Sequence, residues 1–299
     1  MAEQIPKDVM IKVLERLPVK SLIRFACVSK RWRFIILFDP QSAKAHYEVS
    51  RERQTIRRRF LITTSVRFEL NSIDFDTSSF DGMGRIPFEQ PGIKSWSFLC
   101  SCNGLVCATV SISTAAKLVN HMYIWNPSTG FLKKLPDPSM NVYPVFYGMG
   151  YLSATGDYKI IKPGQILSLR TNVWKPIHIP FNYLYAYEGI RVNEALHWFD
   201  EHNPGVVAFD LATEGFRTMP LPHAFKVKNR IRLAASVGRC LCALDYVRVK
   251  FHEYGSIDLW VMRDYGVADS WTKLFNCEFN DWCIIESGHI SVWDTSIIF

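Results

Sequence analysis

One short pattern recurs along the chain and limits the folds that it can adopt. Turn residues followed by an apolar strand return at intervals of about 46 residues. The copies lie at Asn103–Cys107, Gly148–Leu152, Asn193–Trp198, Gly238–Cys242 and Ser287–Ser291. A strand-turn-strand segment such as Tyr123–Pro136 follows each of the first four copies. Four short strands per repeat match one blade of a β-propeller, whose faces must be covered by neighbouring blades. Residues 60–299 are therefore predicted to form an irregular β-propeller of about five to six blades, with a β-sandwich array as the competing architecture.

Three short helices are predicted before this β region, so the expected fold class is mainly β with a small all-α N-terminal domain. The first runs at helical spacing from Pro6 to Leu17 and ends at Pro18. The second covers residues 20–28, and the third covers residues 29–37 with a serine at its N-cap position. So small a bundle cannot bury all of its apolar side chains, and we expect an exposed apolar face that another protein covers.

The positive charge of the chain is concentrated at its N-terminal end. Residues 1–60 hold 14 Lys and Arg against six Asp and Glu, whereas the remaining residues hold 21 against 22. This asymmetry predicts an acidic partner for the helical end. The predicted domains are residues 1–47 (helical), 48–59 (a basic linker) and 60–299 (β-rich).

Five arginines fall within residues 51–59. A solvated connector or helix face is the favoured interpretation, with phosphate binding and a nuclear address as alternatives. A helix-turn-helix DNA-binding protein is not favoured, because no helix carries several polar side chains suited to reading bases. Nucleic acid is therefore not predicted as a partner.

The N-terminal pattern resembles a known family. The residues that carry it are Ile5-Pro6-x-Asp8, Leu14-x-x-Leu17-Pro18-Val19-Lys20-Ser21-Leu22-x-Arg24-Phe25 and Cys27-Val28-Ser29-Lys30-Arg31-Trp32-Arg33. They closely resemble the F-box, a motif that binds the small acidic Skp adaptor, which in turn binds a cullin scaffold. The resemblance implies that seven residues form or support the adaptor interface: Pro6, Val9, Leu14, Leu17, Pro18, Leu22 and Val28. The alternative for any single residue is that it packs in the core of the helical bundle rather than at the interface; this applies to Val13, Leu14, Phe25 and Trp32.

The β region resembles a second family. Its motifs are Ser101-Cys102-Asn103-Gly104-Leu105-Val106-Cys107, Trp125-Asn126-Pro127-Ser128-Thr129, Gly156-Asp157-Tyr158-Lys159-Ile160-Ile161 and Ser270-Trp271-Thr272-Lys273-Leu274. They are similar to the plant F-box-associated, kelch-like domain, which is found in S-locus, S-locus-like and F-box/kelch-repeat proteins. Only nine residues follow Ile290, too few for another blade. We therefore expect either a C-terminally shortened chain or a closing strand supplied by the Phe60–Thr63 region.

Sequence signatures of catalysis are absent: no G-x-S-x-G, H-E-x-x-H or P-loop pattern occurs. The pairs Cys100/Cys102 and Cys240/Cys242 are expected to pack in the core rather than bind zinc, which prefers a C-x-x-C turn. His197 and His289 are expected at strand ends. Neither a cofactor nor a metal is predicted, and the protein is not expected to be an enzyme.

Together, these observations and resemblances predict the substrate-recognition subunit of an SCF-type (Skp-cullin-F-box) ubiquitin ligase, which recruits a target protein for ubiquitination and degradation. The tyrosine-rich segment with Tyr183, Tyr185 and Tyr187 is a candidate target-binding site. A propeller that binds a glycan or small ligand behind a vestigial F-box is the alternative. No secretory signal or membrane-length apolar stretch occurs, so the cytoplasm or nucleus is the expected location, with reduced cysteines.

Overall fold

The protein is described from a computed structural model, which divides the chain into two compact units. One unit combines Met1–Asp137 with Gly288–Phe299, and the other is Pro138–Ser287. The structure describes residues 6–53, 58–64, 69–74, 80–85, 92–114, 117–127, 129–138, 146–180, 188–219, 221, 230–235, 240–250, 253–278 and 290–294.

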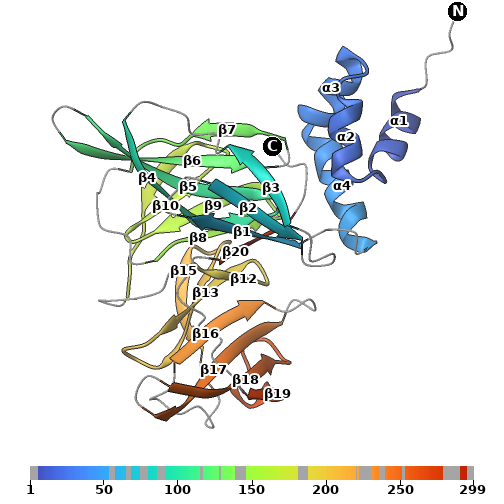
Figure 1. Ribbon diagram of the computed structural model, residues 1–299. Coiled ribbons are helices and arrows are strands. Elements are labelled where there is room, and N and C mark those ends of the chain that lie inside the picture. Colours follow the sequence, from blue (N-terminus) through green and yellow to red (C-terminus); the bar gives the residue numbers. More distant parts are fainter. Residues whose placement is uncertain are drawn as a thin grey trace, which may run out of the picture. The chain divides into compact units, whose positions relative to one another are not determined.

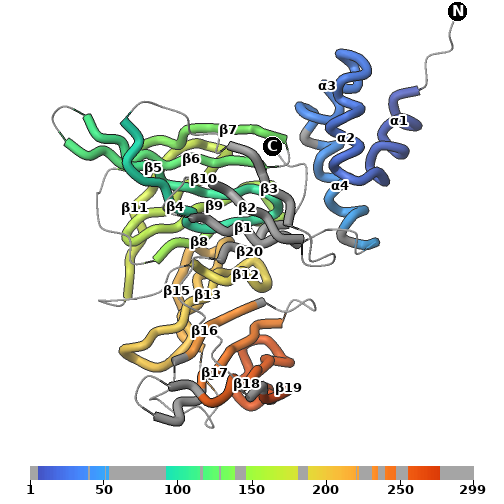
Figure 2. Tube along the Cα trace, viewed as in Figure 1, coloured from blue at the N-terminus to red at the C-terminus, as the bar shows by residue number. Residues whose placement is uncertain are grey.

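The N-terminal region contains four helices, which Figures 1 and 2 show as one cluster: α1 (Lys7–Leu14), α2 (Val19–Phe25), α3 (Lys30–Leu37) and α4 (Pro40–Glu52). Pro6 and Pro18 stand at the N-caps of α1 and α2, where the missing N–H of proline costs nothing. Ser29 caps α3, because its hydroxyl accepts a hydrogen bond of 3.1 Å from the backbone N–H of Trp32. The three predicted helices are therefore confirmed.

Helix α4 was not predicted. The third predicted helix ends at Leu37, as expected, but Asp39 and Pro40 then begin a fourth helix. Asp39 Oδ1 accepts a hydrogen bond from the backbone N–H of Gln41 (3.1 Å), and Asp39 Oδ2 accepts one from the hydroxyl of Ser42 (3.2 Å). An aspartate at the N-cap followed by proline in the first turn is a helix start signal as well as a stop signal. The segment around residue 47, predicted as the end of the helical domain, thus lies inside a helix.

Two antiparallel four-stranded sheets belong to the first unit. Their strands are β1 (Arg58–Thr64), β2 (Glu69–Asp74), β3 (Phe80–Arg85), β4 (Ile93–Cys102), β5 (Leu105–Ser113), β6 (Leu118–Asn126), β7 (Phe131–Lys134) and β20 (Ile290–Asp294). One sheet has the order β20-β1-β2-β3, and the other has the order β4-β5-β6-β7.

The last strand of the chain pairs with the first. Phe60 lies opposite Val292, and Ile62 lies opposite Ile290, in an antiparallel register. Of the two expectations for the C-terminal end, this pairing confirms a partner strand from the Phe60–Thr63 region. The sheet thus joins segments from the two ends of the β region.

Three antiparallel four-stranded sheets belong to the second unit, each a meander of strands consecutive in sequence (Figure 1). Their strands are β8 (Gly148–Leu152), β9 (Asp157–Lys162), β10 (Gln165–Ser168), β11 (Val173–Pro176), β12 (Ile190–Val192), β13 (Ala195–Asp200), β14 (Gly205–Asp210), β15 (Gly215–Met219), β16 (Arg230–Ala235), β17 (Leu241–Lys250), β18 (Glu253–Met262) and β19 (Trp271–Glu278). A short 3-10 helix, η1 (Ala268–Ser270), precedes β19. Five sheets of this size among the described residues confirm the predicted blades.

Neighbouring sheets of the second unit cover each other's faces, as the repeat predicted. Ile161 and Ile166 of one sheet share a core cluster with Trp198 and Phe209 of the next. The approach is close at Gly148, where an added Cβ would lie 2.8 Å from both Leu196 and Trp198. The glycines of the Gly148-Met149-Gly150 segment therefore allow neighbouring parts of the second unit to pack closely.

Candidate functional site

The helical region has a compact apolar core. Met10, Leu14, Leu22, Ala26, Ile35 and Ile36 form this core. Of the seven residues predicted at the adaptor interface, Leu14 and Leu22 belong to it, with exposed fractions of 4% and 3%. A side chain so deeply buried can support an interface but cannot contact a partner directly.

The other predicted interface residues reach the surface. Val9 and Val28 are 47% and 63% exposed, and Pro6 and Pro18 are also exposed. Leu17 is half-buried at the end of the α1–α2 turn. Four exposed apolar residues with a half-buried fifth are what an interface without its partner would present.

Further apolar side chains in the helical region are exposed, and these residues were not among those predicted at the interface. Val13 lies four residues after Val9 on α1, whereas Phe34 and Phe38 lie one helical turn apart on and just after α3, with ring centroids 6.5 Å apart. Their exposed fractions are 51%, 57% and 59%, respectively. The four-residue spacing was visible in the sequence, but the choice of the face that points outward depends on helix packing.

Apolar exposure is concentrated on the helices. Six of the twelve large hydrophobic residues found exposed in the described part of the chain lie in the helices or in the turns between them: Val9, Val13, Phe25, Val28, Phe34 and Phe38. Val13 and Phe25 are therefore surface residues rather than core residues, whereas Leu14 is core. The rings of Trp32 and Phe25 form a T-shaped pair with a centroid distance of 5.6 Å.

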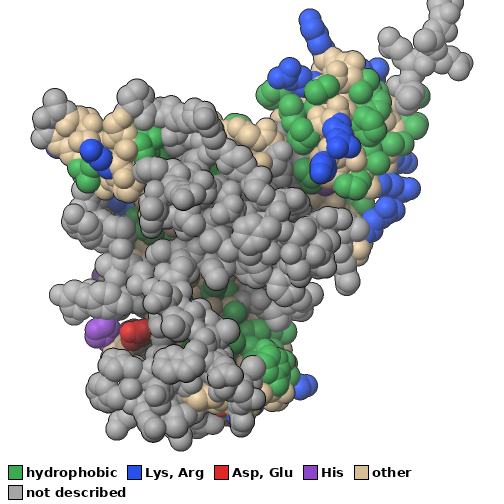
Figure 3. All heavy atoms as spheres, viewed as in Figure 1, with side chains coloured by type: hydrophobic (Ala, Val, Ile, Leu, Met, Phe, Trp, Pro, Cys, Tyr) green, Lys and Arg blue, Asp and Glu red, His purple; other side chains and the backbone are tan. Residues whose placement is uncertain are grey.

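Basic side chains surround these apolar residues. Residues 6–53 contain eleven Lys and Arg but only five Asp and Glu. Figure 3 shows lysine and arginine side chains beside hydrophobic ones on the helical region. The exposed basic residues of the first three helices and their turns are Lys7, Lys12, Arg16, Lys20, Arg24, Lys30, Arg31 and Arg33. The surface thus combines apolar contact area with positive charge, which suits an acidic partner.

Helix α4 packs onto this bundle through a buried histidine. His46, which is 5% exposed, places its Nε2 2.8 Å from the carbonyl oxygen of Leu17. Burial lowers the pKa of His46, whereas the hydrogen bond to Leu17 and the nearby charge of Glu15 act in the opposite direction. The imidazole is therefore neutral at physiological pH and donates its Nε2–H to the carbonyl.

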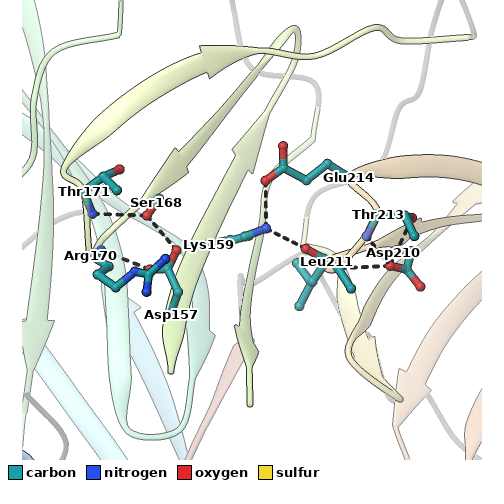
Figure 4. Close-up of polar contacts among 10 residues, drawn as sticks. Asp157, Lys159, Ser168, Arg170, Thr171, Asp210, Leu211, Thr213 and Glu214 are labelled. Carbon is teal, nitrogen blue, oxygen red and sulfur yellow. Dashed lines mark hydrogen bonds and ion pairs between the residues drawn. The ribbon is translucent and has the colours of Figure 1, made fainter. Parts of the chain in front are cut away.

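In the second unit, polar residues join neighbouring sheets. The Nζ of Lys159 donates to the carbonyl of Leu211 (2.6 Å) and to Glu214 Oε1 (2.7 Å), as Figure 4 shows. Asp210 accepts hydrogen bonds from the backbone N–H groups of Ala212 and Thr213 and thereby holds the turn that receives the lysine. The Gly156–Ile161 motif thus includes a residue that bridges two sheets.

Asp157, the other charged residue of that motif, stabilises a turn in its own sheet. Its carboxylate accepts the hydroxyl proton of Ser168 (2.6 Å) and the backbone N–H of Arg170 (3.0 Å; Figure 4). Asp157 and Lys159 are both buried and paired, so we assign them structural roles.

His197 also joins two sheets, and its predicted position at a strand end is wrong. It lies within β13 and is fully buried, with Nδ1 2.9 Å from the carbonyl oxygen of Ile190 and Nε2 2.7 Å from the hydroxyl of Tyr265. Because a carbonyl only accepts, Nδ1 donates and the tyrosine donates to Nε2. Burial lowers the pKa of His197 to about 4; the Ile190 bond opposes this shift, and the charge of Arg217 adds to it. A neutral imidazole with both nitrogens engaged is a structural link rather than a catalytic base.

Several sequence-based expectations lie outside the described residues, namely those for Tyr183, Tyr185, Tyr187 and His289. Cys100, Cys102 and Cys242 are buried, and Cys240 is half-buried. Among the described residues, no group of three or more His, Cys, Asp or Glu side chains could hold a metal ion. The same residues include no helix that is long and apolar enough to cross a membrane.

The comparisons with known proteins agree with the division into helical and β regions. A model of the F-box domain matches residues 3–40, and a model of the F-box associated beta propeller domain matches residues 58–293. The helical and β regions together define an F-box protein. The chain belongs to the family of F-box proteins that carry an F-box associated beta propeller domain. An F-box domain implies binding to a Skp-type adaptor, and proteins of this family are typically non-catalytic ligase adaptors.

Relatives from Arabidopsis thaliana match almost the whole chain. F-box protein CPR1 is 28% identical over 320 residues, which cover 92% of this chain and 73% of the relative. F-box/kelch-repeat protein At3g23880 is 26% identical over 305 residues, covering 91% of this chain and 79% of the relative. F-box protein At3g07870 is 24% identical over 323 residues, covering 92% and 72%. Helix α4 extends beyond the segment that the F-box model matches.

Proposed function

We propose that this protein is the substrate-recognition subunit of an SCF-type ubiquitin ligase. Its F-box would bind a Skp-type adaptor, the adaptor would bind a cullin scaffold, and the β-propeller domain would hold a protein target for ubiquitination. The observation that carries the proposal is the surface of the helical region, which exposes six large apolar side chains among basic ones. Exposed apolar groups cost free energy in water, so a partner that covers them is expected to bind.

In this proposal the residues of the F-box have two roles. Pro6, Val9, Pro18 and Val28 contact the adaptor directly, because their side chains are exposed. Leu14 and Leu22 hold the helices in place from the core, and Leu17 stands between the two groups. Basic side chains at the rim attract the acidic adaptor and increase its association rate, an effect that added salt screens.

The protein itself needs no catalytic residue for this function. A receptor that holds target and ligase in one complex raises the effective concentration of target lysines near the ubiquitin-charged enzyme. Tyr183, Tyr185 and Tyr187 remain our proposed target contacts. The free cysteines of the described residues fit the reducing conditions of the cytoplasm or nucleus, where we propose that the protein acts.

The test uses the full chain and a purified plant Skp-type adaptor. Val28→Asp places a charge at a position that is 63% exposed, so the variant is expected to fold, yet to bind the adaptor at least about tenfold more weakly. Val173→Asp makes the same change on β11, at a position 53% exposed, and should leave adaptor affinity unchanged. Equal adaptor affinity for wild type and Val28→Asp would remove this surface from the proposed interface.

A further inference from the structure

Helix α4 contributes a buried face to the helical bundle, although it extends beyond the segment that the F-box model matches. Ala43 and His46, three residues apart on α4, are 4% and 5% exposed. Both line a small cavity together with Leu14 and Leu22, two residues proposed to support the adaptor surface. The interior of the F-box is therefore completed by α4.

The polar contact of His46 reaches the turn between α1 and α2. Its Nε2 lies 2.8 Å from the carbonyl oxygen of Leu17, which is 29 residues earlier in the chain. The α1–α2 turn is otherwise held by local hydrogen bonds, from the backbone N–H of Leu17 to the carbonyl of Leu14 and from that of Ser21 to the carbonyl of Pro18. The His46 bond is thus a long-range attachment of this turn.

A histidine is not the residue that packing alone would favour at position 46. With Nε2–H donating to Leu17, the neutral ring leaves Nδ1 as an acceptor. That nitrogen is buried and finds no hydrogen-bond partner among the described residues. An unpaired buried nitrogen costs free energy that an apolar side chain of similar size would not cost. The favourable polar contribution of His46 is therefore its bond to Leu17.

The anchored turn carries Leu17 and Pro18, two of the residues proposed to form the adaptor surface. We infer that His46 is a positioning residue, which holds the α1–α2 turn in the conformation that the adaptor binds, and that the adaptor-binding module extends through α4 to Glu52. This inference rests on the proposed function, because it assigns a further residue to the same adaptor interface.

Two amide substitutions of different reach test the inference in the full chain. The side-chain nitrogen of glutamine can take the place of Nε2, whereas that of asparagine corresponds to Nδ1 and stops short of the Leu17 carbonyl. We expect His46→Gln to keep wild-type affinity for a purified Skp-type adaptor and His46→Asn to bind roughly fivefold more weakly. Ala43→Gly is the matched control: it loosens α4 at the same cavity without touching Leu17 and should bind like wild type.

Affinities are to be measured by titration calorimetry at a temperature where circular dichroism shows every variant to be folded. Equal affinities for His46→Asn and wild type would overturn the inference, as would an equal loss in His46→Gln and His46→Asn or in Ala43→Gly. Failure of the wild-type chain itself to bind the adaptor would instead refute the proposed function.

Discussion

Acidification should weaken the fold of the second unit through His197. The imidazole is fully buried between two sheets, and its pKa is lowered to about 4, mainly by burial. In the unfolded chain the same group titrates near its ordinary value of about 6.5. Between these two values the unfolded state binds more protons than the folded state, so stability decreases as the pH falls.

The size of this effect follows from the two pKa values. A difference of about 2.5 pH units corresponds to roughly 3 kcal/mol once the pH lies below both values. At pH 5 the unfolded histidine is almost fully protonated and the folded one is about 10% protonated, so about 2 kcal/mol is lost relative to pH 7.5. A loss of this size is large beside the stability of a typical domain.

The assay compares wild type with His197→Asn by urea unfolding at pH 7.5 and pH 5.0. Asparagine keeps an N–H group near the Nδ1 position, which donates to Ile190, but it does not titrate. All other titrating groups are common to both proteins, so the difference between their pH dependences isolates His197. We expect the variant to lose about 2 kcal/mol less than wild type on acidification.

Equal losses in the two proteins would refute the reasoning. Because the substitution can also lower stability at neutral pH, a second measurement follows the imidazole proton resonances of wild-type His197 by NMR. Between pH 7.5 and 5.0 they should shift by only about a tenth of the full titration change. A midpoint near 6.5 would contradict a buried neutral ring.

Two further predictions concern the packing between sheets. Replacement of Lys159 by Met should lower the free energy of unfolding, measured in urea, by about 2 to 4 kcal/mol. The reason is that the carbonyl of Leu211 and the carboxylate of Glu214 would lose their shared donor. A change under about 0.5 kcal/mol would show that the bridge is not stabilising. Gly148→Val should lower the thermal midpoint of unfolding by several degrees, since its Cβ would lie 2.8 Å from Leu196 and Trp198. Gly130→Val is the comparison, because an added Cβ there has no atom within 4 Å. Its φ of +74° means that it should lose only the free energy of the backbone strain.

Much of the fold followed from local sequence patterns. The repeat of about 46 residues predicted four-stranded sheets, because each copy contains turn residues and apolar strands. Too few residues remain after Ile290 for a new sheet, so a closing strand from Phe60–Thr63 was one of two expectations for the end of the chain, and the structure contains it. Helix ends at Pro18 and Ser29 followed from proline geometry and capping.

The features that the sequence did not predict share a physical cause: each depends on contacts between residues that are distant in sequence. Asp39-Pro40 can end one helix and begin another. A helix begins there only if the apolar residues of α4 pack against the other helices. His197 was placed at a strand end, but its environment is set by Tyr265, 68 residues later. The outward positions of Phe34 and Phe38 depend on which face of α3 the other helices cover. Neither pairing nor exposure of this kind is encoded in local spacing.

The central claim is that the helical region is an incomplete surface that an acidic adaptor covers. Titration calorimetry of the full chain with a Skp-type adaptor at several temperatures tests it most directly. We expect a one-to-one complex with a negative heat-capacity change, because apolar side chains such as Val9, Val28 and Phe34 leave water on binding. A chain that stays folded and monomeric yet gives no binding heat at any temperature, and no complex on gel filtration at tens of micromolar, would contradict the account.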